Sequence, residues 1–119
     1  MKKYIFLLLA AMLCVFSSYA DTRDTCPIQG ANGASVVAEA AGKGHNEVYI
    51  NFYNDSSSYV NLTVYVTVEN QSGYTASGSK TFLVKPGRDT GTVKITGVSW
   101  AKDNFSVTEV SVSGARCSK

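Results

Sequence analysis

The chain has 119 residues, 45% of them hydrophobic and 17% charged, which suits one globular domain. Its formal charge of +2 equals the contribution of Lys2 and Lys3, so residues 21–119 are formally neutral. A neutral domain excludes the classes of protein that bind nucleic acid or an anionic membrane surface through a basic patch.

Residues 1–20 have the pattern of a bacterial signal peptide. Two lysines precede an apolar run over 5–16, and Ser18-Tyr19-Ala20 places small residues where a signal peptidase cuts. The apolar run is shorter than the roughly 20 residues that a membrane-spanning helix needs. We therefore expect cleavage before Asp21 and an exported protein that is periplasmic, at the cell surface or secreted.

Cys14 raises the alternative of a lipoprotein signal, in which the cysteine is lipidated. Such signals have a small residue directly before the cysteine, and here that residue is Leu13, which fits poorly. We expect contact with a membrane only if Cys14 carries a lipid.

Cys26 and Cys117 lie near the two ends of the expected domain. In an oxidising compartment two such cysteines form a disulfide by default. Closing so long a loop stabilises a fold by about 4–5 kcal/mol in the chain-entropy model, and it requires the first and last segments to lie side by side. A metal site is the weaker interpretation because neither thiol has a nearby His or Cys partner, and we predict no cofactor.

The first part of the expected domain is polar, and alternation begins only after it. Residues 21–34 are rich in Gly and Ala and contain an Asn32-Gly33 turn signal. Apolar residues then recur at every second position over 36–40 and again over 48–53, separated by the breaker Gly42-Lys43-Gly44-His45-Asn46. This period of two predicts half-buried strands.

The clearest strand is 59–69. Valine or leucine occupies every even position from 60 to 68, and the odd positions carry Tyr, Asn, Thr and Glu. β-Branched residues dominate the segment, and a helix would scatter its apolar residues around the axis. We predict a strand that follows a turn over 54–58.

The remaining segments are shorter. After a turn at 70–73 we expect a weak segment over 74–79, a strand over 80–85, a Pro86-Gly87 turn and a strand around Val93 and Ile95. In the last strand the apolar residues occupy odd positions up to Val107 and even positions from Val110 onward. This change predicts a β-bulge near Thr108-Glu109, or a strand that bends there and crosses to another sheet.

Together these segments predict an all-β fold. About seven short strands in one domain, residues 21–119, indicate an antiparallel two-sheet sandwich of immunoglobulin-like type. A closed barrel is the alternative.

Two stretches resemble a known family. Asn51-Phe52-Tyr53-Asn54, a short serine loop and Val60-Asn61-Leu62-Thr63-Val64 are similar to the B–C region of bacterial immunoglobulin-like modules of the fibronectin type III and cell-adhesion-related kind. Residues 82–87 followed by 91–95 are similar to their strand–Pro-Gly–strand segment. The resemblance implies a fold and transfers no site. It departs from antibody domains, because these cysteines join the chain ends.

Little in the sequence points to catalysis. His45 is the only histidine of the chain and lies in a glycine-containing turn. It could act as the base of a catalytic triad only if a carboxylate and a nucleophile from distant parts of the chain lay next to it. The carboxylates are scattered singly, without the spacing of an acid–base pair or a calcium loop. We predict that the protein is not an enzyme.

A Tyr/Asn surface is the first candidate binding site. The polar face of the two strands flanking the serine loop carries, in chain order, Tyr49, Asn51, Tyr53, Tyr59, Asn61 and Tyr65. If these strands pair, the side chains form one rigid surface suited to protein or sugar. Two alternatives remain: the strands belong to opposite sheets, or the residues are ordinary members of an exposed strand face.

Trp100 is the second candidate, either as a loop tryptophan that anchors a ligand or as a plug of the sandwich. The sequence favours an exported, non-catalytic binding module at or near a bacterial envelope, with an unknown protein or carbohydrate ligand. The alternatives are a structural or assembly subunit that associates through a sheet edge, and an inhibitor of another secreted protein.

Overall fold

The computed structural model describes residues 22–96 and 105–118, and it contains strands and turns in this part of the chain. The strands are β1 (Arg23–Pro27), β2 (Ser35–Gly44), β3 (Glu47–Asn54), β4 (Val60–Asn70), β5 (Thr75–Val84), β6 (Gly87–Lys94) and β7 (Phe105–Ser113). The expected signal peptide 1–20, with Cys14, and the candidate Trp100 lie outside the described residues.

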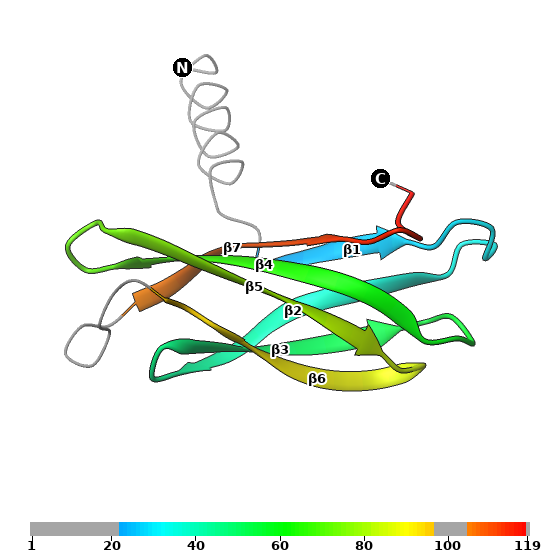
Figure 1. Ribbon diagram of the computed structural model, residues 1–119, viewed down its shortest axis with the longest axis horizontal. Coiled ribbons are helices and arrows are strands. Elements are labelled where there is room, and N and C mark those ends of the chain that lie inside the picture. The colour runs from blue at the N-terminus through cyan, green and yellow to red at the C-terminus, as the bar shows by residue number, and fades with distance from the viewer. Residues whose placement is uncertain (1–21, 97–104, 119) are drawn as a thin grey trace, which may run out of the picture.

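The strands form two antiparallel sheets, with the orders β1-β2-β3-β6 and β5-β4-β7. Figure 1 shows β2, β3 and β6 in one layer and β4, β5 and β7 in the other. The chain changes sheet between β3 and β4, between β5 and β6, and between β6 and β7. At the second change Gly87 has a positive φ of 86°. The predicted all-β architecture of two antiparallel sheets is confirmed. The barrel alternative is wrong for the described strands, because they divide into two separate sheets.

The core lies between the sheets and follows from the alternation of the sequence. In β4 the valines and leucine from Val60 to Val68 are buried, while Asn61, Tyr65 and Glu69 are exposed. Among the described residues Phe52 is the largest fully buried side chain, and its ring centroid lies 5.0 Å from that of Phe82 in the opposite sheet. Aromatic and β-branched side chains from both inner faces thus fill one continuous core.

A disulfide closes one side of the molecule. Cys26 at the end of β1 is bonded to Cys117, with 5.0 Å between the Cα atoms, as the cysteine pattern predicts. Ile28 forms an isolated antiparallel bridge with Cys117, and the backbone amide of Val112 donates to Oδ2 of Asp24 over 2.8 Å. β1 therefore belongs to one sheet and covers the edge of the other, beside β7 (Figure 1).

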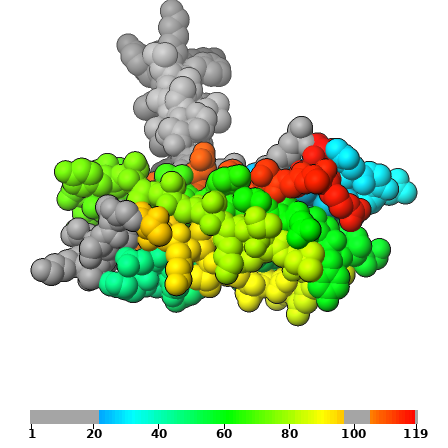
Figure 2. Space-filling view, viewed as in Figure 1, coloured from blue at the N-terminus to red at the C-terminus, as the bar shows by residue number. Residues whose placement is uncertain are grey.

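On the opposite side, the edges of β5 and β6 lie next to one another (Figure 2). A Cβ atom on Gly78 would lie 2.1 Å from the backbone oxygen of Lys94, and one on Gly91 would lie 2.3 Å from Cε1 of Phe82. Only glycine permits this close approach of the two edges.

Some local predictions are wrong. β1 occupies part of the segment expected to be an irregular polar stretch, because the disulfide and pairing with β2 hold it extended. β2 continues through Gly42 and Gly44, with a register shift after Ala40, because β3 pairs with it up to the hairpin turn. β5 is one strand over 75–84, because it pairs with β4 along its whole length.

The predicted bulge in the last strand is confirmed. Thr67 pairs with Glu109 and Val68 with Val107, so Thr108 is the extra residue. The Thr108 hydroxyl donates to the Thr67 carbonyl over 3.2 Å. β7 pairs with β4 on both sides of the bulge, so the alternative of a strand that changes sheet is wrong.

Candidate functional site

The Tyr/Asn surface predicted from the sequence is not one surface. β3 pairs with β2 and β6, whereas β4 pairs with β5 and β7. β3 and β4 do not pair, and the alternative that the two strands belong to opposite sheets holds, because the loop at 55–59 carries the chain from one sheet to the other. Tyr49, Asn51 and Tyr53 lie on the outer face of one sheet, and Asn61 and Tyr65 on the outer face of the other, with Tyr59 just before β4.

On the first sheet the aromatic side chains have local partners. The Tyr49 hydroxyl donates to Oε1 of Glu47 over 3.0 Å. This hydrogen bond, followed by the negative charge of Glu47, raises the pKa of Tyr49 above 10.0. The Tyr49 side chain lies over two glycines of β2. A Cβ atom added to Gly42 would lie 3.6 Å from Cδ2 of Tyr49, and one added to Gly44 would lie 2.5 Å from its hydroxyl oxygen. Tyr49 thus covers two positions of β2 that lack side chains, Gly42 and Gly44.

The other two residues of this half are also held in place. The guanidinium of Arg88 lies 5.6 Å from the ring centroid of Tyr53, at a distance typical of a cation–π pair. Asn51 is half-buried and lies in register between Glu39 of β2 and Thr90 of β6. This half of the predicted surface stabilises its own sheet.

On the second sheet the aromatic side chains are more open. Tyr65 is 49% exposed and Tyr59 is 59% exposed. Among the described residues no hydrogen-bond or ring partner is present for the Tyr65 side chain. Leu83, which the sequence analysis did not single out, is 60% exposed and lies opposite Asn61 on the same outer face. Its odd-numbered position, on the opposite face of the strand from Phe82 and the buried Val84, would have identified it.

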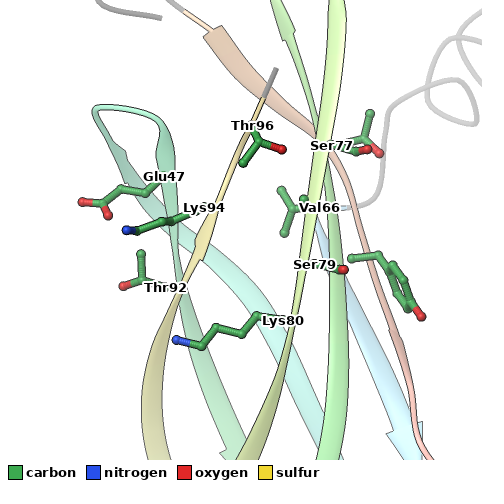
Figure 3. Close-up of a pocket in the computed structure, with 11 residues that line it drawn as sticks. Glu47, Val66, Ser77, Ser79, Lys80, Thr92, Lys94 and Thr96 are labelled. Carbon is green, nitrogen blue, oxygen red and sulfur yellow. The ribbon is translucent and has the colours of Figure 1, made fainter. Parts of the chain in front are cut away.

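An open groove of about 970 Å³ runs over the edge of β5. Its lining combines hydroxyl groups, two lysines, one carboxylate and Tyr65; the residues are Glu47, Tyr65, Val66, Thr67, Ser77, Gly78, Ser79, Lys80, Thr92, Lys94 and Thr96. Figure 3 shows Lys80 extending from β5 toward Thr92 of β6, while Ser77 and Ser79 point the opposite way. The groove therefore crosses the β5 edge, from β6 of the first sheet onto the outer face of the second.

Lys80 has an unusual position for a charged residue. It pairs in register with the buried Val64 and shares its parity with Phe82 and Val84, so its stem starts on the inner face of the edge strand. The ammonium group lies 5.5 Å from the ring centroid of Phe82. The aliphatic stem covers the core edge and the charge reaches solvent. Inward-pointing charges of this kind protect an edge strand from pairing with another chain. The inward position of Lys80 could have been predicted from the sequence, because Lys80 has an even number like its inward-facing neighbours Phe82 and Val84.

The side chains of Asn54 and Asp89 hold two turns of the chain through hydrogen bonds. The Asn54 amide donates to the carbonyls of Ser58, at 2.9 Å, and Val84, at 3.2 Å, and its oxygen accepts from Ser56. The Asp89 carboxylate accepts from the backbone amides of Lys85, at 3.2 Å, and Thr90, at 2.9 Å, which lower its pKa below 3.8 in that order of importance. Both groups shape turns.

His45 lies exposed in the turn between β2 and β3, next to Asn46, whose φ is 61°. Over residues 22–96 and 105–118, the His, Cys, Asp and Glu side chains form no group of three or more that could hold a metal ion. In the same ranges no helix has the length and apolar character to cross a membrane.

The chain was compared with protein-family models, with curated proteins and with solved structures, and none of the three comparisons finds a match.

Proposed function

We propose that the protein is an exported, non-catalytic interaction module that binds its partner through the outer face of the β5-β4-β7 sheet. The observation that carries this proposal is the exposure of Tyr59, Tyr65 and Leu83, at 59%, 49% and 60%, on or beside a single sheet face. The opposite side of that sheet is fully packed core. Exposed aromatic and apolar side chains on a rigid support lose little entropy on binding.

The other sheet is a weaker candidate for the binding surface. Tyr49 bonds Glu47 and covers glycines, and Tyr53 stacks against Arg88. A partner would have to break these local contacts before it gained new ones. The second sheet offers its aromatic area without that cost.

An immunoglobulin-like topology is the second part of the proposal. In such sandwiches the central pairs are strands B with E and C with F, in opposite sheets. If β3, β4, β6 and β7 are these four strands, the observed pairs β3–β6 and β4–β7 match, and β2 takes the place of strand A. The disulfide differs from that of antibodies, since it joins β1 to the segment after β7.

Export to an oxidising compartment fits the disulfide, since such bonds persist in the periplasm, at cell surfaces and in secreted proteins. The non-catalytic part of the proposal rests on the isolated position of His45 and on the wide scatter of the carboxylates. An inhibitor of a secreted protein would use the same exposed face, so it is a special case of the same proposal.

Assembly through a sheet edge is less well supported. Lys80 places a charge on the inner side of edge strand β5, and Gly78 of the same strand lies against Lys94. At the other edge, Asp24 accepts from the Val112 amide of β7, and the disulfide lies beside it. Both devices oppose the addition of another strand.

The test is capture of envelope components by the oxidised protein, which is purified after expression of the full chain in an exporting bacterium. The immobilised protein is incubated with solubilised envelope, and both the protein and the polysaccharide that it retains are measured. We expect Tyr65→Ser and Leu83→Ser each to reduce specific capture by about tenfold, as for truncation of an interface anchor. Tyr53→Ser, on the other sheet, is the matched control and should capture like the wild type. Equal capture by Tyr65→Ser and the wild type, or loss only with Tyr53→Ser, would contradict the proposal.

A further inference from the structure

Tyr65 lies at the centre of a block of outward-facing residues on three strands. Ser79 of β5 and Ser111 of β7 are its partners in register on either side. Thr63 and Thr67 precede and follow it on the same face of β4. The four diagonal neighbours, from the same registers, are Ser77, Thr81, Glu109 and Ser113.

All neighbours of Tyr65 in this block except Glu109 carry a hydroxyl group. Each Ser or Thr hydroxyl is one donor and two acceptor sites, so the face offers a dense array of both. Within the array, Thr63 and Thr81 already exchange a hydrogen bond of 2.9 Å across the two strands. The surrounding side chains are shorter than tyrosine, and Tyr65 as a whole residue is 49% exposed.

The charge of the block excludes some ligands. It contains no Lys or Arg, and its one charged residue is Glu109, so an anionic ligand would meet a carboxylate and no cation. Of the two lysines of the groove, Lys80 belongs to β5 but points away from this face, and Lys94 belongs to β6 of the other sheet (Figure 3).

The block also differs from the centre of a protein interface. Interface hot spots are packed and desolvated, and need apolar surroundings for their aromatic anchors. Here the nearest exposed apolar side chain on the face, Leu83, lies opposite Asn61 and outside the block. An aromatic ring among hydroxyl groups suits a ligand that is itself a ring with apolar C–H faces and hydroxyl edges.

We infer that this block is a binding site for a neutral carbohydrate chain, with a sugar ring stacked on Tyr65 and its hydroxyl groups bonded to the flanking serines and threonines. Five residues of β4 span about 13 Å and three strands about 10 Å, which accommodates more than one sugar ring. This inference rests on the proposed function, because it names the ligand class of the same sheet face.

Affinity gel electrophoresis tests the inference, with the oxidised protein run through gels that contain xyloglucan, mixed-linkage β-glucan, galactomannan or dextran. Polygalacturonate serves as the acidic comparison, and cellulose and chitin are tested by co-sedimentation. We expect retardation or sedimentation by at least one neutral polysaccharide. Tyr65→Ser should weaken that binding by about tenfold or more, and Tyr65→Phe, which keeps the ring, should retain most of it.

Tyr53→Ser on the opposite sheet should bind like the wild type, and thermal unfolding of each variant verifies that it is folded. The inference is overturned if none of the neutral polysaccharides binds, if only polygalacturonate binds, or if Tyr65→Ser binds as tightly as the wild type. A third outcome separates the two proposals: the wild type binds no polysaccharide, but Tyr65→Ser captures less envelope protein than the wild type. The interaction module would then be supported and the carbohydrate ligand would be refuted.

Discussion

Asn54 is the residue whose replacement best tests the architecture of the fold. It ends β3, is only 4% exposed, and hydrogen-bonds the loop that carries the chain to the second sheet. Through the Val84 carbonyl it also reaches the end of β5, which belongs to the opposite sheet. We expect Asn54→Ala to loosen this link between the sheets.

The size of the effect follows from the hydrogen bonds of the Asn54 amide. Its nitrogen donates to Ser58 and Val84, and its oxygen accepts from the amide and the hydroxyl of Ser56. At a net of about 1 kcal/mol per bond the loss would be about 4 kcal/mol. The Ser56 groups can turn toward water, so we expect about 2–3 kcal/mol, which corresponds to roughly 10–20 °C in melting temperature.

Urea unfolding of the oxidised protein, followed by circular dichroism, measures this loss as a lower midpoint at an unchanged slope. Asn61→Ala is the matched control, because Asn61 is exposed on β4, and its effect should stay within about 0.5 kcal/mol. If Asn54→Ala unfolds at the same urea concentration as Asn61→Ala, the amide does not join the sheets and the reasoning fails.

Three further predictions concern the two edges and one turn. Gly78→Ala should lower the free energy of unfolding by more than about 2 kcal/mol, because the added Cβ would lie 2.1 Å from the Lys94 backbone oxygen. The control Ser79→Ala should change it by less than about 0.5 kcal/mol in urea unfolding. Equal urea midpoints for the two variants would contradict the close approach of the edges. Replacing Cys26 and Cys117 together by alanine should lower the free energy of unfolding by about 4 kcal/mol, because the disulfide joins residues 91 positions apart. A loss below about 1 kcal/mol, measured by calorimetry, would contradict this stabilising role of the disulfide. The lowered pKa of Asp89 stabilises the folded state above pH 3.8, and this contribution is lost as the pH falls through the lowered folded value. Asp89→Asn should therefore be less stable than the wild type at pH 7, the difference should shrink in acid, and a difference independent of pH would refute the assignment.

Alternation along the chain was sufficient to predict the strands with one buried face. β4 is the clearest example, since each of its buried and exposed positions follows from parity alone. The change of parity in β7 likewise predicted the bulge, because an extra residue is the simplest way to return valines to the core. Parity could not predict β1 or the first half of β5, which are held by backbone pairing and contain few apolar side chains.

The candidate site shows the limit of the same reasoning. Parity correctly placed Tyr53 and Tyr65 on outer faces, but a strand pattern does not say which strand lies beside it. The structure separates the two tyrosines onto opposite sheets and surrounds Tyr65 with Ser79 and Ser111, which are distant in the sequence.

The sequence by itself determined which side chains of β3 and β4 face the core and that Cys26 could join Cys117, because hydrophobic alternation and cysteine chemistry can be read directly from the residues. Only the tertiary structure decided which faces the exposed side chains share, because strand order depends on how two sheets close around one core. The hydroxyl block around Tyr65 exists only in that strand order, since β5, β4 and β7 meet there from three separate parts of the chain.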